Sequence, residues 1–285
     1  MGRVAKGKST TYIDFGKVQS GMRSSYAYHT DQEAYDFYMG ARYLQDMMFY
    51  KQGKIDSVFQ PEDLRDNNRK YAGLIACKQT TDNTTYFEVG SSCLGVIEAL
   101  EYLNKEHSEL DLNSTKFVGV DNSQWMNFAA VNCHKDYEVE VFEDAKDATH
   151  VKSDFFFAKG VSLMYAYQDE ESMCNMLKNT RLAVFDYTFA TKGKISEVID
   201  TGLGITYLNY DKCKEILNVD GRVLVEKPYV IKKYNQGVTK ISYDCIYGDK
   251  DIVDNYLGQL ENITGENLDN YGDPKFIRQE NFEYY

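Results

Sequence analysis

The stretch Tyr86-Phe-Glu-Val-Gly-Ser-Ser-Cys-Leu-Gly-Val-Ile-Glu98 predicts a strand, a turn of small residues and the start of a helix. In open α/β sheets, ligands bind where parallel strands end. Gly90 permits a tight turn and a close ligand approach. The N–H groups of the helix start, near Ser91–Gly95, suit a carboxylate or a phosphate. Glu88 can accept a hydrogen bond from a ligand ammonium or hydroxyl group, so we expect a ligand site at this turn.

Short β-rich segments alternate with helical ones after this point. The alternation predicts a mostly parallel sheet that is covered on both faces. The expected strands span residues 84–89, 117–120, 138–142, 154–158 and 181–189. Two longer strands, 222–231 and 237–247, flank the turn signal Asn235-Gln236-Gly237 and predict an antiparallel hairpin.

The ends of the chain differ from this central part. Residues 31–51 have apolar side chains at helical spacing, and residues 52–76 predict a second, shorter helical region. We therefore divide the chain into an N-terminal arm and helical cap (1–76), an α/β domain (77–250) and an acidic C-terminal segment (251–285). The sequence assigns no element to this last segment.

Composition excludes several classes of partner. The formal net charge is −12, and an acidic surface repels phosphate backbones, so we expect no nucleic-acid partner. No apolar run approaches membrane-spanning length, so no membrane partner is expected. The 6 cysteines include no C-x-x-C pair, which predicts no metal site and a reducing, cytoplasmic location.

The quoted stretch resembles the first motif of class I S-adenosylmethionine-dependent methyltransferases, through Glu88-x-Gly90-x-Ser92-x-Leu94-Gly95. Three later segments follow in the order of that family: Phe117-Val-Gly-Val-Asp121, Val139-Glu-Val-Phe-Glu-Asp-Ala145 and Asp154-Phe-Phe-Phe-Ala-Lys-Gly160. The resemblance covers about residues 80–247, including the hairpin. It implies an α/β, Rossmann-like, mostly parallel seven-stranded sheet with a C-terminal antiparallel hairpin, and S-adenosylmethionine as cofactor.

The resemblance also implies which residues bind the cofactor. Asp121 would contact the ribose hydroxyls, Asp144 the adenine, and Lys159 would face the reacting sulfur. The full set of candidate cofactor-binding residues is Glu88, Gly90, Ser91, Ser92, Gly95, Asp121, Asn122, Asp144, Ala145 and Lys159. Asp121 has an alternative as the cap of the following helix, and Lys159 as a solvated loop residue.

Two residues depart from the family pattern, because Ser92 and Leu94 stand where glycines are usual. We therefore expect the backbone of this loop either to follow a different path from that of the family or to bind the cofactor weakly. This departure motivates an alternative function, a non-catalytic interaction protein that keeps the fold. A second alternative is an NAD-dependent oxidoreductase, which the hairpin and Asp144 disfavour.

Methyl transfer is an in-line displacement in which the enzyme aligns the nucleophile and sometimes removes its proton. His29 and Tyr165 are the candidate catalytic residues, and Tyr165, Tyr167 and Tyr26 are the candidate substrate contacts. Core packing is the alternative for Tyr165 and Tyr167. Two further titratable residues are expected to have no catalytic role. Glu98 is expected to lie in solvent on a helix surface, and His134 is expected to complement a helix dipole.

The acceptor is expected to be a small molecule. Family members that methylate base amines carry an Asn/Asp-Pro-Pro-aromatic string after the fourth strand, whereas this chain has Ala158-Lys-Gly-Val-Ser162. The sequence therefore favours a small-molecule methyl acceptor, with O-methylation of a sugar or another metabolite as the specific hypothesis. A homo-oligomer is compatible with the sequence.

Overall fold

The computed structural model describes residues 32–54, 64–78, 84–107, 110–159, 169–192, 195–196, 209–234, 238–265 and 278–282. The chain forms two compact units, Met1–Tyr71 with Gly90–Ala148, and Ala72–Val89 with Thr149–Tyr285. The predicted boundary at residue 76 falls inside helix α4 (Leu64–Lys78). The boundary at residue 250 falls at the start of helix α10 (Lys250–Thr264). A separate cap over residues 1–76 stays a prediction.

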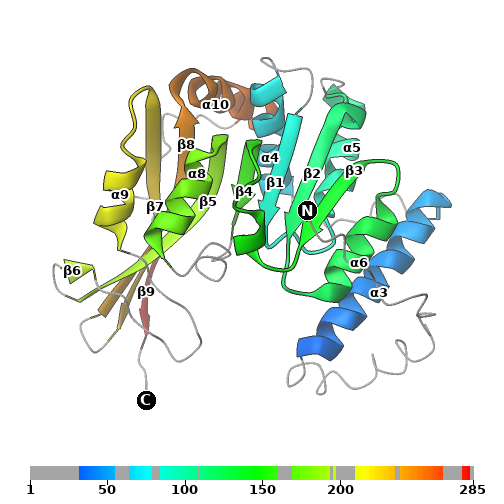
Figure 1. Ribbon diagram of the computed structural model, residues 1–285, viewed down its shortest axis with the longest axis horizontal. Helices are drawn as coiled ribbons and strands as arrows, with labels where there is room; N and C mark the ends of the chain where they lie inside the picture. The colour runs from blue at the N-terminus through cyan, green and yellow to red at the C-terminus, as the bar shows by residue number, and fades with distance from the viewer. Residues whose placement is uncertain are drawn as a thin grey trace. The chain divides into compact units, whose positions relative to one another are not determined.

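The first unit contains two parallel strands and three long helices. Its elements are α3 (Gln32–Lys51), α5 (Val96–His107), η2 (Leu112–Ser114), β2 (Thr115–Val120), α6 (Gln124–Cys133), β3 (Glu138–Phe142) and η3 (Ala145–Ala148). β2 and β3 pair in parallel from Lys116↔Glu138 to Val120↔Phe142. Helix α3 lies beside α6 (Figure 1), where Tyr43 and Leu44 pack against the buried residues Cys93, Met126 and Ala129.

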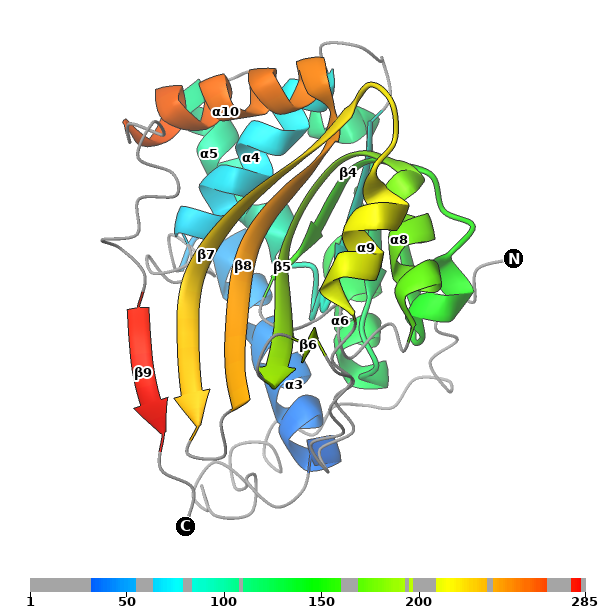
Figure 2. The same cartoon turned by 90° about the vertical axis from the view of Figure 1, so that its left-hand side faces the viewer.

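The second unit holds the longer part of the sheet. Its strands are β1 (Thr84–Val89), β4 (Ser153–Ala158), β5 (Thr180–Lys192), β6 (Ile195–Ser196), β7 (Arg222–Tyr234), β8 (Val238–Asp249) and β9 (Arg278–Phe282). Within this unit their order is β1-β4-β5-β8-β7-β9, with β6 paired to β5. β1, β4 and β5 are parallel, whereas β8 is antiparallel to both β5 and β7 and lies between them (Figure 2).

This topology confirms the predicted fold class, but the structure describes nine strands where seven were predicted, because β6 and β9 were not expected. The hairpin β7–β8 returns its second strand next to β5, which gives a Rossmann-like, mostly parallel sheet with an antiparallel C-terminal end. All the predicted strands are present with ends shifted by a few residues. β1 and β4 are buried on both faces, as strands of a covered parallel sheet must be.

The segment after residue 248, to which the sequence assigned no element, contains α10 and β9. α10 buries Ile252, Val253, Tyr256 and Leu260 along one face and ends at Gly265, whose φ of 67° is the left-handed conformation of a glycine C-cap. β9 pairs in parallel with β7, outside the hairpin. The other helices of this unit, α8 (Glu170–Lys178) and α9 (Tyr210–Leu217), lie side by side (Figure 2).

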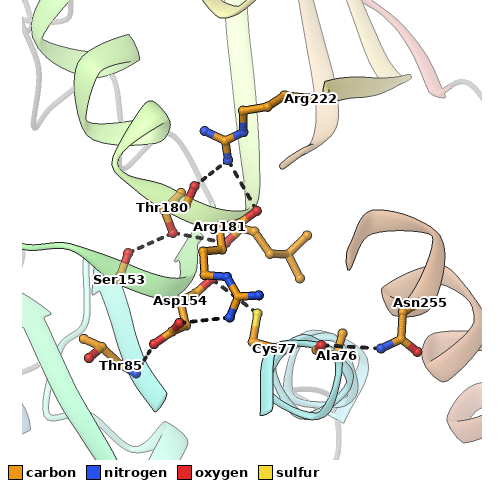
Figure 3. A network of polar contacts seen from close by, with 10 residues as sticks. Ala76, Cys77, Thr85, Ser153, Asp154, Thr180, Arg181, Arg222 and Asn255 are labelled. Atoms are coloured by element: carbon orange, nitrogen blue, oxygen red, sulfur yellow. Dashed lines mark hydrogen bonds and ion pairs between the residues drawn. The ribbon is translucent and has the colours of Figure 1, made fainter. Parts of the chain in front are cut away.

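A polar network fixes the amino ends of β4 and β5 (Figure 3). Asp154 accepts hydrogen bonds from Arg181 Nη1 at 3.3 Å and from the Thr85 backbone N–H at 2.8 Å. The Arg222 guanidinium lies 4.3 Å from the ring centre of Tyr247 and donates to the carbonyls of Lys178, Thr180 and Arg181. Because ligands bind at the other ends of these strands, we assign this network a structural role.

None of the helices that the structure describes is long and apolar enough to cross a membrane.

Candidate cofactor site

The β1–α5 loop, Gly90–Gly95, keeps a glycine-type backbone without the glycines. Gly90 has a φ of 72°, and the non-glycine residues Ser92 and Leu94 have φ values of 50° and 53°. A non-glycine residue seldom adopts such values. Ser92 and Leu94 are the positions where the methyltransferase motif has glycines. Ser92 and Leu94 therefore adopt the left-handed conformation that glycine favours at these two positions.

The side chain of Leu94 does not project from this loop into solvent. Leu94 is 0% exposed. Its Cδ2 lies 3.3 Å from the point that a Cβ on Gly119 would occupy, and Ser91 Oγ lies only 2.6 Å from that point. The missing side chain of Gly119, in β2, makes room for both. Gly90 and Ser92 meanwhile remain exposed, so the outer side of the loop is open to a ligand.

Asp121 joins this loop to the end of β2. Its Oδ2 accepts a hydrogen bond from the Ser92 backbone N–H at 2.9 Å, and its Oδ1 accepts one from the Ser123 N–H at 2.9 Å. The alternative that Asp121 caps α6 is wrong, because Ser123 is the N-cap and its Oγ accepts from Met126 N. The cap lies two residues later because the chain turns at Asp121 before the helix begins. Since a carboxylate oxygen can accept more than one hydrogen bond, Asp121 can serve the loop and a ligand together.

The end of β3 carries the next predicted residues. Asp144 is exposed, and its Oδ1 accepts a hydrogen bond from the Lys146 N–H at 2.9 Å at the start of η3. Ala145 is buried and Asn122 is exposed. The Asp121 N–H donates to the Phe142 carbonyl at 3.1 Å, which brings the ends of β2 and β3 together. The first unit thus presents the β1–α5 loop, Asp121 and the β3 end in chain order.

The second unit carries the other two predicted cofactor residues. Glu88 is buried in β1 and accepts a hydrogen bond from Tyr86 Oη at 2.8 Å. Lys159 follows β4 and forms ion pairs with Asp186, and with Asp244 at 2.7 Å. The strand register explains this pairing, because Ala158 is level with Phe185 and Asp186 is level with Asp244. The alternative of Lys159 as a solvated loop residue is wrong, because its side chain is only 15% exposed.

Asp186 and Asp244, which lie within β-rich segments, were not predicted as site residues. Their side chains are 9% and 6% exposed. The available signal was one acid in the apolar interior of each of two adjacent strands, since such an acid needs a charged or hydrogen-bonding partner. Finding that partner requires the register of the sheet.

A buried cluster of three polar side chains, Tyr43, Glu98 and His134, contacts the β1–α5 loop. Glu98 Oε2 accepts from Tyr43 Oη at 2.6 Å, and Glu98 Oε1 lies 3.1 Å from Nδ1 of His134. His134 Nε2 lies 3.1 Å from the carbonyl oxygen of Cys93, in the loop itself. The prediction that Glu98 lies in solvent is wrong, since its side chain is 2% exposed. The position of Glu98 in the sequence could not predict its burial, because the residue that covers it, Tyr43, belongs to helix α3, which is distant in the chain.

Burial controls the protonation of this cluster. It raises the pKa of Glu98 to about 8, against the smaller lowering effect of the Tyr43 hydrogen bond. It lowers the pKa of His134 to about 4, against the raising effect of the Cys93 carbonyl. His134 does stand at the C-cap of α6, as predicted. At neutral pH its ring is uncharged, however, so it does not complement the helix dipole as a cation.

The remaining candidates, His29, Tyr26, Tyr165 and Tyr167, lie outside the described residues. Their assignments as catalytic and substrate residues stay predictions.

No protein-family model matches the sequence, and no curated protein matches it either. Several solved structures are similar in fold. The N-terminal domain of EvdMO1, with SAH bound, shares 12% identity over 65% of this chain and 81% of that chain, at a TM-score of 0.43. The plantazolicin methyltransferase BamL, in complex with a desmethylPZN analog and SAH, shares 12% identity over 87% and 96%, at a TM-score of 0.39. A precorrin-6y C5,15-methyltransferase from Geobacter metallireducens shares 17% identity over 63% and 88%, at a TM-score of 0.34.

Proposed function

We propose that the chain is an S-adenosylmethionine-dependent methyltransferase that acts on a small molecule, with O-methylation of a sugar or another metabolite as the specific reaction. One observation carries the proposal. The β1–α5 loop keeps left-handed conformations at Ser92 and Leu94 and is tied to Asp121 at the end of β2. Holding two non-glycine residues in this conformation costs about 1–2 kcal/mol each, and strain of this kind concentrates at functional sites.

The described residues fit the cofactor in their chemistry. The N–H groups of Gly90, Ser91 and Leu94 donate within the protein, so the start of α5 is where backbone N–H groups would bind a carboxylate. Asp121 offers carboxylate oxygens to ribose hydroxyls, and Asp144, exposed after β3, offers an acceptor to the adenine. Leu94 leaves the outer side of the loop clear because its side chain is buried against Gly119. The bound cofactor would supply a methyl group on a cationic sulfur.

The chain's own residues would orient the acceptor and take up its proton. Asp186 and Asp244 share the ammonium group of Lys159, level with the end of β4. Carboxylates and an ammonium group together can bind hydroxyls as acceptors and donors. A carboxylate there can also receive the proton that a hydroxyl nucleophile loses. This chemistry supports a polyhydroxylated acceptor over an apolar one.

Calorimetric titration with SAH tests the cofactor assignment. We expect binding to the wild type and at least tenfold weaker binding to Asp144→Asn, which keeps the shape of the side chain but removes its charge. The matched control is Asp147→Asn, an exposed aspartate in the short helix η3 that follows Asp144. Equal losses in the two variants would contradict the assigned role of Asp144.

Two further measurements separate the alternatives. A fluorescence titration with NADH would show binding if the chain is a nicotinamide-linked oxidoreductase. Transfer of a labelled methyl group to a pool of sugars and other hydroxylated metabolites tests catalysis. Binding of SAH without any transfer would favour the non-catalytic interaction protein, and no binding of SAH at millimolar concentration would refute the proposed function.

A further inference from the structure

The buried cluster of Tyr43, Glu98 and His134 packs against the β1–α5 loop and has a polar contact with the carbonyl oxygen of Cys93 in that loop. His134 Nε2 lies 3.1 Å from that oxygen and 3.3 Å from Tyr43 Oη. A carbonyl oxygen can only accept a hydrogen bond, so Nε2 must carry a hydrogen. The Tyr43 hydroxyl donates to Glu98, and its oxygen can accept from the same Nε2–H.

The hydrogen on Nε2 determines the protonation state of Nδ1, the other ring nitrogen of His134. A neutral imidazole carries one N–H, so a hydrogen on Nε2 leaves Nδ1 with a lone pair. Nδ1 faces Glu98 Oε1 at 3.1 Å. A hydrogen bond at this distance requires a proton between the two atoms, either on the carboxylic acid or on the ring. If that proton leaves, a carboxylate oxygen faces a nitrogen lone pair and the contact becomes repulsive.

We propose that Glu98 is a positioning residue that holds the β1–α5 loop in its ligand-binding conformation through His134, and that it does so only while the pair retains this proton. The Cys93 carbonyl accepts a hydrogen bond from Nε2–H of His134, and Nδ1 of the same ring accepts one from the protonated Glu98. Tyr43 of α3 donates a further hydrogen bond to Glu98. The inference rests on the proposed function only in taking SAH as the ligand of the loop.

The surroundings place the proton on Glu98. Glu98 and His134 are 2% and 1% exposed, and burial disfavours the ion pair, so the neutral acid beside a neutral ring is the stable form. The opposing influence is the first turn of α5, where Glu98 stands and where an anion is favoured. Burial is the largest influence on both pKa values and outweighs it.

The other titratable groups around the cluster come from each neighbouring element. Tyr43 and Lys51 belong to α3, Glu101 to α5 and Cys133 to α6, while Cys93 lies in the loop. Lys51 is half exposed and is engaged with the Cys133 carbonyl and Asp136. Glu101 accepts a hydrogen bond from Tyr137 Oη. Lys51 is thus the one cation among these groups, and it acts from the protein surface.

The variant Glu98→Gln tests the proposal because an amide reproduces the protonated acid. Its N–H₂ can donate to Nδ1 of His134 and its oxygen can accept from Tyr43, with no proton to lose. The matched control is Glu101→Gln, which makes the same chemical change one helical turn away on α5. Calorimetric titration with SAH at pH 6.5, 7.5 and 9 would be run on all three proteins, with circular dichroism to verify folding.

We expect the affinity of the wild type for SAH to fall about tenfold per pH unit above pH 8. Glu101→Gln should keep this fall but at slightly lower pH, because the Glu101 charge helps to raise the pKa of Glu98. Glu98→Gln should show only the change caused by titration of SAH itself, which all three proteins share. Equal pH dependence of the wild type and Glu98→Gln would overturn the proposal. Loss of binding by folded Glu98→Gln at every pH would also overturn it, because the ionised form would then be the active one.

A second measurement is independent of SAH. Hydrogen exchange of the segment 90–95 is compared between the ligand-free wild type and Glu98→Gln at the same pH, so that intrinsic exchange rates cancel. We expect faster exchange in the wild type at pH 9 and equal exchange at pH 6.5. Equal exchange at pH 9 would refute the role of Glu98. A protein that shows the expected exchange but never binds SAH would refute the proposed function alone.

Discussion

Ser92 and Leu94 share one backbone conformation but differ in what their side chains contribute. Both have a positive φ, and releasing such a residue by a change to glycine gains about 1 kcal/mol. Ser92 is exposed, so Ser92→Gly should raise the free energy of unfolding by up to about 1 kcal/mol. Leu94 is 0% exposed, and deletion of a buried leucine side chain costs about 3–5 kcal/mol. Leu94→Gly should therefore destabilise the chain by about 2–4 kcal/mol net. Urea denaturation measures both, and a stabilised Leu94→Gly would contradict this account of the loop.

The candidate site also shows which residue-level features a sequence pattern can predict and which it cannot. The sequence correctly predicted that the loop follows β1 and that Asp121 and Asp144 follow β2 and β3, because strand ends and turns are encoded by neighbouring residues. It could not predict that Glu98 is buried, since the group that covers it, Tyr43, lies 55 residues earlier. Nor could it predict that Ser123 rather than Asp121 caps α6. That choice depends on the hydrogen bond from Ser92 that already engages Asp121.

At the scale of elements, the ion pairs of Lys159 connect the end of β4 to β5 and β8. The three side chains are 15%, 9% and 6% exposed, so removal of the ammonium takes a close counter-charge away from two buried carboxylates. Lys159→Met should lower the free energy of unfolding by about 3–5 kcal/mol at pH 7.

The control for this prediction removes all three charges together. The triple variant Lys159→Met, Asp186→Asn, Asp244→Asn removes the three charges together and should recover most of the lost stability. Thermal and urea unfolding at pH 7 would measure the effect. A single variant as stable as the wild type would show that the ion pairs carry little energy.

Arg222 makes a comparable connection at the opposite edge of the sheet. Its guanidinium donates to the carbonyls of Thr180 and Arg181 (Figure 3). It also donates to the Lys178 carbonyl and stacks on the ring of Tyr247. Arg222→Ala should destabilise the chain by about 3 kcal/mol through the unsatisfied carbonyls and the lost stacking. Arg222→Lys should recover less than half of this loss, because lysine lacks the planar fork. SAH affinity should be unchanged in both folded variants, and a selective loss of SAH binding would contradict a purely structural role.

The elements themselves were predictable to different degrees. Strands β1 to β5 and the hairpin follow from apolar runs and turn residues, which are local signals. Helix α10 was missed although Ile252, Val253, Tyr256 and Leu260 recur at helical spacing, so a local signal for it was present in the sequence. β9, Arg-Gln-Glu-Asn-Phe, has almost no apolar content, and only its pairing with β7 makes it a strand.

At the scale of the whole molecule, the Glu98–His134 pair should leave a signature in the dependence of stability on pH. Glu98 has a folded pKa of about 8 against 4.5 unfolded, so its contribution is lost as pH rises through this range. His134 has a folded pKa of about 4 against 6.5 unfolded, so its contribution is lost as pH falls through that range.

The two contributions cancel between pH 4.5 and 6.5, because the folded and unfolded states each hold one proton there. Above pH 6.5 the unfolded pair has lost its proton while the folded pair keeps it until about pH 8. The free energy of unfolding should thus fall by about 1.4 kcal/mol per pH unit, and by up to about 2 kcal/mol over this interval. Glu98→Gln should lack this fall, since above pH 6.5 neither of its states gains or loses a proton at this site.

Urea denaturation of both proteins between pH 6 and 9 would measure the difference, in which the titration of the other carboxylates and histidines cancels. The net charge of −12 makes this cancellation necessary, because repulsion among so many acids adds its own slope to either curve alone. Parallel curves would mean that the proton leaves Glu98 well below pH 8. In that case the ring of His134 would have to turn away from the Cys93 carbonyl at physiological pH.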